Sequence, residues 1–265
     1  FASKMKTILE FCSETTARRE VFENLRNAFT TPFPNCTQDN QRHIGVFTGI
    51  SVEVFDKQGI NAIYGCGCYG KGSKSRSAPQ SLKKAKQQND ETVKSAPNEA
   101  DESLSLDLEE SFLLAYFIEV LQINNLDGNT MSWHQMLQAC LTLKPKFIEC
   151  FVAYLYLKSN NWVIKSGIKF GGDFLIYQGG PHLFHASFIV FISCVCSPLQ
   201  MAPKDFKGLQ RIAENSNKDV LLLEVISPKA LNLLTAMCFL GSITHYFRNE
   251  HLTLYFSQGY VIGIT

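Results

Sequence analysis

The chain has 265 residues, of which 45% are hydrophobic and 18% are charged. This composition allows one or two domains with a substantial core, and it excludes wholesale disorder and a collagen-like repeat. The 25 Lys and Arg residues nearly balance the 24 Asp and Glu residues, giving a formal net charge of +1, so a nucleic-acid partner would have to be bound by a local basic patch.

Residues 1–71 combine helical and strand signals. Apolar residues spaced through a charged background predict a helix over residues 5–27, and alternation with a period of two predicts a strand over residues 45–55. We therefore expect a small N-terminal α/β region that ends at residue 71.

Residues 72–103 have almost no large apolar side chain, and the lysines at 83, 84, 86 and 94 give way to acidic residues at 99, 101 and 102. Such a segment cannot bury enough apolar surface to offset the entropy lost when its backbone becomes ordered. We expect a disordered linker or loop here.

Residues 104–226 carry the strongest periodicity, which begins with three predicted helices. Asp107, with Glu110 three residues later, has the spacing that opens a helix, and apolar residues up to position 121 form one face of it. Residues 132–143 start with the capping-box spacing Ser-x-x-Gln. A third helix fits residues 145–157, because its proline stands where no backbone N–H is needed.

The rest of this region is rich in strand signals. The predicted strands are residues 162–165, 168–177, 185–195 and 219–226. Gly-Gly-Pro at 179–181 marks a bend, and residues 205–215 are a short helix candidate. Helices followed by a mixed sheet predict an α/β or α+β domain, so we expect an α/β chain with two domains.

No part of the sequence predicts a membrane span. The longest apolar runs, residues 184–195 and 231–243, are shorter than the roughly 18 to 20 residues that a spanning helix needs, and polar groups interrupt both. Phe1 stands where an initiator Met is expected and no signal peptide pattern follows, so we expect the chain to be a fragment.

The nine cysteines include no C-x-x-C pair. Structural zinc sites usually use two closely spaced ligand pairs of that kind, whereas the close pairs here are C-x-C, at Cys66/Cys68 and Cys194/Cys196. We therefore expect no metal site and reduced thiols, which places the chain in a reducing compartment, the cytosol or the nucleus.

The Gly-rich residues 65–72 nearly match the phosphate-binding loop G-x-x-x-x-G-K-[ST]. Gly72 has no hydroxyl group for Mg²⁺, and the predicted linker follows instead of a helix whose N-terminus would face a phosphate. We therefore expect a specific backbone path rather than a nucleotide site, with Lys71, Lys74 and Arg76 as candidates for contact with a polyanion.

Tyr177, His185 and Lys218 are candidates for a site at one end of the predicted sheet. His185 follows Tyr177 by eight residues across the Gly-Gly-Pro bend, and strands joined by such a bend bring their flanking residues together. Taken singly, the histidine is more often structural, the tyrosine part of a core edge and the lysine a solvated helix cap. Spacing alone therefore leaves a catalytic role open.

Three blocks of sequence carry a resemblance to a known family: YGCGCYGKGSKSRSAP at 64–79, EESFLLAY at 109–116 and WVIKSGIKFGGDFLIYQGGPHLFHAS at 162–187. Over about residues 20–226 the chain resembles a subunit of the tRNA-splicing endonuclease. The block at 64–79 is similar to that of the larger eukaryotic catalytic subunit. The resemblance implies that residues 104–226 are a catalytic endonuclease-like region with a mixed sheet flanked by helices.

The family's catalytic trio of tyrosine, histidine and lysine falls on Tyr177, His185 and Lys218. The resemblance implies that Tyr177 helps to deprotonate the attacking 2′-OH, His185 protonates the leaving 5′ oxygen, and Lys218 stabilises the transition state. This metal-independent cleavage uses no cofactor, restricts the substrate to RNA, and leaves a 2′,3′-cyclic phosphate and a 5′-hydroxyl. Because the ordinary pKa of tyrosine is about 10, we expect Lys218 to lower that of Tyr177.

Arg211 falls where the family stacks an arginine on a nucleobase, which makes it the candidate RNA-binding residue. The second partner in that sandwich is usually a tryptophan near the C-terminus, but Trp133 and Trp162 both precede Lys218. Residues 227–265 show no match to the family and are a divergent tail. Whether one of its aromatic residues substitutes, and whether the tail belongs to the working protein, stays open.

We therefore expect a catalytic subunit of a nuclear hetero-oligomer, with precursor tRNA and the other tRNA-splicing endonuclease subunits as partners. One alternative is a non-catalytic RNA-binding or scaffold subunit of the same complex. A second is a general nucleic-acid module that binds through the lysines of residues 83–94.

Overall fold

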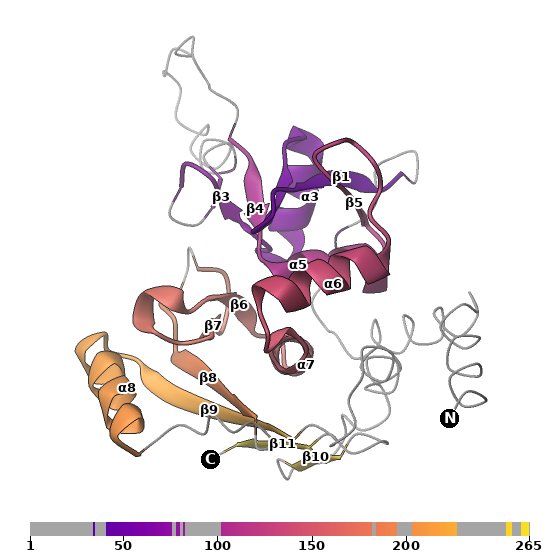
Figure 1. Cartoon of the computed structure of the whole chain (residues 1–265). Coiled ribbons are helices and arrows are strands. Elements are labelled where there is room, and N and C mark those ends of the chain that lie inside the picture. Colours follow the sequence, from indigo (N-terminus) through magenta and orange to yellow (C-terminus); the bar gives the residue numbers. More distant parts are fainter. Residues whose placement is uncertain are drawn as a thin grey trace, which may run out of the picture. The chain divides into compact units, whose positions relative to one another are not determined.

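A computed structural model describes residues 34, 41–75, 78–79, 82, 102–181, 184–194, 203–226, 253–255 and 261–264 (Figure 1). The described residues form two compact units. The N-terminal unit contains residues 31–145 together with 179–185, and the C-terminal unit contains residues 146–178 and those from 186 onward. The helix predicted over residues 5–27 lies outside the described residues.

The N-terminal unit contains a five-stranded sheet with the strand order β3-β4-β2-β1-β5. Its strands are β1 (His43–Phe47), β2 (Val52–Val54), β3 (Lys71–Gly72), β4 (Leu104–Leu106) and β5 (Leu121–Asn124). β1 pairs antiparallel with β2 and parallel with β5. The single strand predicted over residues 45–55 is therefore wrong: Gly49, with φ of 93°, turns the chain between two strands, and the alternation simply continues across the turn.

Among the described residues of this unit, the helical segments with defined bounds are α3 (Lys57–Gly67), α5 (Leu108–Phe112), the π-helix η1 (Leu113–Phe117) and α6 (Trp133–Leu143). Asp56 caps α3 by accepting the Gly59 N–H at 2.7 Å. The predicted helix openings at Asp107 and at Ser132 are confirmed. The helix that opens at Asp107 runs through α5 and η1 and ends at Phe117. Glu119 has φ of 60°, and the chain then enters β5.

The domain boundary expected at residue 104 needs correction. β4 pairs with both β2 and β3, so the strands on either side of the predicted linker belong to one sheet. Gly72, where the predicted linker begins, belongs to β3, and residues 73–103 connect two paired strands rather than two domains. Local sequence could not show this, because the partner of a strand is decided by contacts with distant residues. Most of that segment lies outside the described residues, and its disorder stays a prediction.

The Gly-rich residues 65–72 do not take the position of a phosphate-binding loop. α3 ends at Gly67, Cys68 caps its C-terminus with φ of 54°, and the chain then enters β3. A phosphate-binding loop instead leads from a strand into a helix N-terminus. The structure thus supports the expected backbone path.

Glu110 holds this path in place from inside the unit. Its buried carboxylate accepts the N–H of Gly70 at 2.9 Å and the N–H of Asp107 at 3.1 Å. Gly70 has φ of 75°, and a Cβ atom there would lie 2.8 Å from Cγ of Leu104. One carboxylate therefore joins the Gly-rich loop to the start of α5.

Replacing Glu110 with alanine should lower the free energy of unfolding by about 2 kcal/mol, because two backbone donors lose their acceptor inside the unit. Urea unfolding of the whole chain, followed by circular dichroism, measures this. Glu110→Gln keeps one acceptor oxygen and should lose less. Equal stability of the alanine variant and the unchanged chain would contradict the proposed role.

The C-terminal unit contains a six-stranded mixed sheet in the order β10-β11-β9-β8-β7-β6. Its strands are β6 (Val163–Ser166), β7 (Phe174–Tyr177), β8 (Phe188–Cys194), β9 (Asp219–Ile226), β10 (Thr253–Tyr255) and β11 (Val261–Ile264). β8 and β9 are parallel, and the other neighbours are antiparallel. The predicted strand over 219–226 is confirmed, and two strands of the tail extend the sheet beyond β9.

Two of the predicted strands start later than expected. Residues 168–170 form the 3₁₀ turn η2 (Ile168–Phe170), so β7 begins only at Phe174. Likewise β8 begins at Phe188 rather than at residue 185. At residues 168–173 apolar residues continue the alternating pattern through the turn, which is why the sequence predicted a longer strand there.

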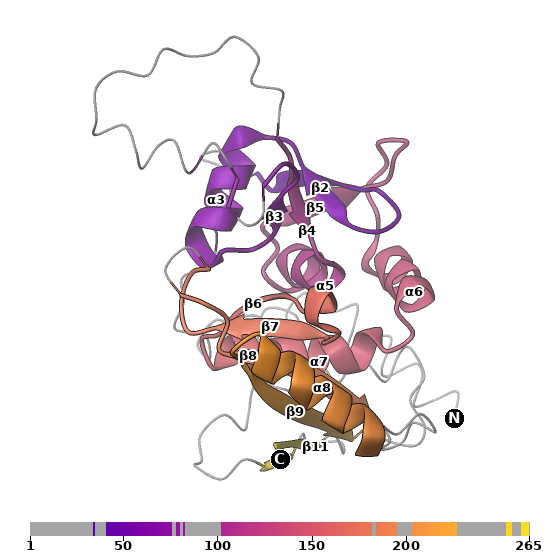
Figure 2. The same ribbon diagram turned by 90° about the vertical axis from the view of Figure 1, so that its left-hand side faces the viewer.

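In the part of this unit that the structure describes, the helices α7 (Phe147–Ser159) and α8 (Pro203–Asn215) flank the sheet. α7 is buried almost all round and contacts β6, β8 and β9, as expected for a helix that is apolar on every face. Figure 2 shows α8 in front of the sheet and α7 behind it. The predicted mixed sheet flanked by helices is confirmed. In the described part of the chain, no helix is long and apolar enough to cross a lipid bilayer.

Candidate active site

Tyr177 and Lys218 lie at the same edge of the C-terminal sheet. Tyr177 ends β7, Lys218 directly precedes β9, and β8 runs between these two strands. The N–H of Ser187 donates to the carbonyl of Ile176 at 2.9 Å, and the N–H of Asp219 donates to the carbonyl of Ser187 at 3.1 Å. Each candidate is therefore next to a residue that is hydrogen-bonded to Ser187.

His185 comes two residues before Ser187 in the chain, and its side chain is exposed. It is the last residue of segment 179–185, which belongs to the N-terminal unit, and one peptide bond joins it to the C-terminal unit. Exposure suits a group that has to reach an RNA. Its catalytic role stays a prediction.

The bend before His185 is tight. The N–H of Phe184 donates to the carbonyl of Gly180 at 3.2 Å, and a Cβ atom on Gly179 would lie 2.8 Å from the Phe184 ring. Only glycine fits at position 179 without moving that ring. The predicted bend at Gly-Gly-Pro is thus confirmed.

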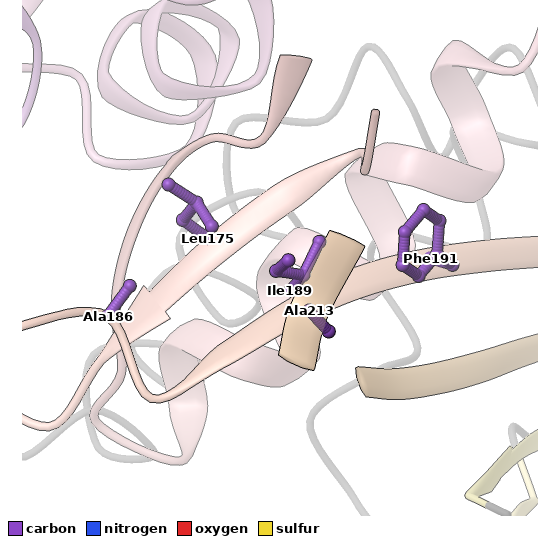
Figure 3. Packing of buried hydrophobic residues seen from close by; sticks show 5 residues of the cluster. All are labelled: Leu175, Ala186, Ile189, Phe191 and Ala213. Carbon is purple, nitrogen blue, oxygen red and sulfur yellow. The ribbon is translucent and has the colours of Figure 1, made fainter. Parts of the chain in front are cut away.

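Tyr177 is half-buried, because its ring packs against a cluster of apolar side chains. We call this the α8 cluster; it consists of Leu175, Ala186, Ile189, Phe191 and Ala213 (Figure 3). Burial raises the pKa of the Tyr177 hydroxyl above its ordinary value. This corrects the expectation that Lys218 lowers it, and the phenol is protonated at neutral pH.

Lys218 is placed by the end of α8. Asn217 has φ of 54°, a left-handed conformation that asparagine tolerates and that commonly ends a helix. The N–H of Lys218 then donates to the carbonyl of Ala213 at 3.0 Å. The ammonium group donates to the carbonyl of Ser216 at 2.8 Å, and it lies 4.7 Å from the centroid of the Phe170 ring.

Sequence reasoning missed the roles of Phe170 and Asp173, although both lie in the block at 162–187. The Asp173 carboxylate accepts the N–H of Ile192 at 2.7 Å, and the Asp173 N–H donates to the carbonyl of Val190 at 2.9 Å. Asp173 therefore fixes the start of β7 against β8. Phe170 lies under the Lys218 ammonium. Both residues lie inside the block that carries the family resemblance, and this was the sequence signal that could have identified them.

Arg211 is exposed on α8, seven residues before Lys218. Tyr255 belongs to β10, but its side chain is outside what the structure describes, so the aromatic partner of Arg211 stays open. Both tryptophans are engaged elsewhere: Trp133 stacks on His134 with 3.2 Å between ring centroids, and Trp162 meets the Phe188 ring edge-on.

Cys66, Cys68, Cys140 and Cys150 are free thiols. Within the described ranges, no group of three or more His, Cys, Asp or Glu residues could hold a metal ion. At the shared edge of the C-terminal sheet, Tyr177 supplies a phenol and Lys218 an ammonium group.

Two family models match the chain. One, the tRNA intron endonuclease N-terminal domain, matches residues 43–137. The other, the tRNA intron endonuclease catalytic C-terminal domain, matches residues 147–231, which contain all three candidates. The chain belongs to the tRNA intron endonuclease family. The N-terminal domain match includes residues 104–137, in agreement with their place in the unit that contains the five-stranded sheet.

Individual relatives agree with this assignment. The chain is 33% identical over 136 residues to the tRNA-splicing endonuclease subunit Sen2 of Rattus norvegicus and 32% identical over 133 residues to that of Gallus gallus. These matches cover 49% and 48% of the chain but only 29% of each relative's length. A tRNA-splicing endonuclease of Hyperthermus butylicus is 29% identical over 179 residues, covering 67% of the chain and 87% of that protein. The resemblance to the larger eukaryotic catalytic subunit is confirmed.

Proposed function

We propose that this chain is a catalytic subunit that cuts precursor tRNA at one intron splice site. The observation that carries the proposal is the shared edge of Tyr177 and Lys218, beside Ser187, inside the segment that matches the family's catalytic domain. A phenol and an ammonium group at the same edge of the sheet, on the strands either side of β8, can both reach one ribose and its phosphate.

The reaction joins the 2′ oxygen of the ribose to the adjacent phosphorus and breaks the bond from phosphorus to the 5′ oxygen. His185 in its protonated form gives a proton to that 5′ oxygen. Lys218 donates to the phosphoryl oxygens, where negative charge builds up. The products are a 2′,3′-cyclic phosphate and a 5′-hydroxyl.

Tyr177 acts next to the attacking hydroxyl. Because burial raises its pKa, little phenolate exists at neutral pH to remove the 2′ proton directly. The phenol oxygen instead accepts a hydrogen bond from the 2′-OH and orients it, and the proton passes to solvent as the new bond forms. Tyr177 thus helps deprotonation by position more than by basicity.

The chain works with the other subunits of a hetero-oligomeric endonuclease in the nucleus, and Arg211 contacts the RNA near the cut. The names of the Sen2 relatives support a complex of several subunits, and free thiols at Cys66, Cys68, Cys140 and Cys150 suit a reducing compartment. The other candidate function is a non-catalytic subunit of the same complex, which is favoured if Arg211 has no stacking partner.

The test is cleavage of precursor tRNA by complexes assembled with and without this chain. We expect one splice site to stay uncut when the chain is left out. A 2′-deoxyribose at the nucleotide before that site should likewise block the cut, because no nucleophile remains, whereas a deoxyribose one nucleotide further away should have no effect. Analysis of the 3′ ends identifies the cyclic phosphate. Cleavage of the deoxy substrate would show that the 2′-OH mechanism is wrong.

A further inference from the structure

The Lys218 ammonium lies over an aromatic ring, which does not neutralise its positive charge. It lies 4.7 Å from the centroid of the Phe170 ring, within the range in which an aromatic face attracts a cation. It also donates to the Ser216 carbonyl at 2.8 Å. Because an ammonium group has three donors and a ring uses none of them in a conventional hydrogen bond, donors remain for phosphoryl oxygens.

The position of Phe170 is fixed by a turn of glycines. The N–H of Phe170 donates to the carbonyl of Gly167 at 2.8 Å, and the N–H of Gly172 donates to the same carbonyl at 3.2 Å. Gly171 has φ of 71°, and a Cβ atom on Gly167 would lie 2.8 Å from the carbonyl oxygen of Gly172. Because this turn requires glycine at positions 167 and 171, its backbone conformation is restricted. The turn therefore fixes the position of Phe170.

The α8 cluster connects Phe170 with Tyr177 and with Lys218, the two candidates at the sheet edge. Phe170 and Tyr177 each pack against this cluster. Ala213 belongs to the cluster as well (Figure 3). Its carbonyl accepts the N–H of Lys218. The same packing therefore sets the Phe170 ring, the Tyr177 ring and the start of the Lys218 side chain.

We propose that Phe170 is a positioning residue for the cleavage reaction: the face of its ring holds the Lys218 ammonium at the edge where Tyr177 lies. A lysine side chain has four rotatable bonds and loses much freedom when it is held in one place. The ring restricts that freedom before RNA binds and, unlike a carboxylate, does not neutralise the charge that the phosphate needs. This inference rests on the proposed function.

The test compares Phe170→Leu, which keeps an apolar side chain and removes the ring, with Phe170→Tyr, which keeps the ring. Single-turnover cleavage of precursor tRNA by the reconstituted complex is the measurement. We expect the leucine variant to slow the cut made by this chain about tenfold with unchanged tRNA affinity, and the tyrosine variant to stay within about twofold. Leu222→Val is the matched control, since Leu222 packs against the same cluster.

A double-mutant cycle separates positioning from packing. In the Lys218→Ala complex, Phe170→Leu should cause no further loss, because the ring then has no ammonium group to hold. An equal loss in both backgrounds, a loss as large in Leu222→Val, or no loss at all would overturn the proposal while the proposed function stands. A complex in which Lys218→Ala itself changes nothing would overturn the proposed function together with this inference.

Discussion

Replacing His185 with alanine should abolish the cut made by this chain and leave the cut made by the other catalytic subunit. Loss of a general acid usually costs about 10² to 10⁴ in rate. The leaving 5′ alkoxide then departs without a proton, which is its least favourable form. Single-turnover assays with the reconstituted complex, resolved on denaturing gels, should show an intermediate in which the intron is still joined to one tRNA half.

A modified substrate makes this prediction specific to proton donation. When sulfur replaces the leaving 5′ oxygen, the thiolate departs without a proton, and the His185→Ala complex should regain most of its rate. His134→Ala is the matched control, because His134 is also exposed and lies in the N-terminal unit. Normal processing of both splice sites by the His185 variant would reject the catalytic assignment in favour of the scaffold function.

Replacing Lys218 with alanine has the second largest expected effect. Loss of one group that stabilises developing charge typically lowers the rate by about 10² to 10³. Because charge on the phosphoryl oxygens increases only as the transition state forms, the maximal single-turnover rate should fall while the affinity for precursor tRNA changes little. Lys218→Arg should recover only part of the rate, since a planar guanidinium fits neither the Ser216 carbonyl nor the Phe170 face in the same way.

Lys207 provides the control for this experiment. It is exposed on α8, and Lys207→Ala removes the same charge from the same helix without touching the sheet edge. Its maximal rate should stay within about threefold of the unchanged complex, because an exposed charge far from the reacting atoms contributes mainly to association. Equal losses at both lysines would mean that Lys218 serves general RNA attraction.

Elements that depend on neighbours within one turn were predicted well. The helix openings at Asp107 and Ser132 follow from side chains that satisfy backbone N–H groups three residues away. The strand β9 followed from an apolar run. Alternation failed at residues 45–55 and 168–177, because a tight turn does not interrupt the pattern of side chains.

Features that join distant residues could not be predicted in this way. The placement of residues 104–143 in the N-terminal unit depends on the pairing of β4 with β2. The Phe170 ring under Lys218 joins residues 48 positions apart. No local pattern encodes such contacts, since they arise when separate elements pack.

For the candidate site, the sequence determined which chemical groups are available: motif spacing together with the family resemblance predicts Tyr177, His185, Lys218 and Arg211. The tertiary structure decided their surroundings. Strand pairing through Ser187 places Tyr177 and Lys218 at one sheet edge, and packing against the α8 cluster sets the direction of the Tyr177 pKa shift. The physical reason is that a side chain's identity is local, whereas its burial and its partners are created by segments that meet only on folding.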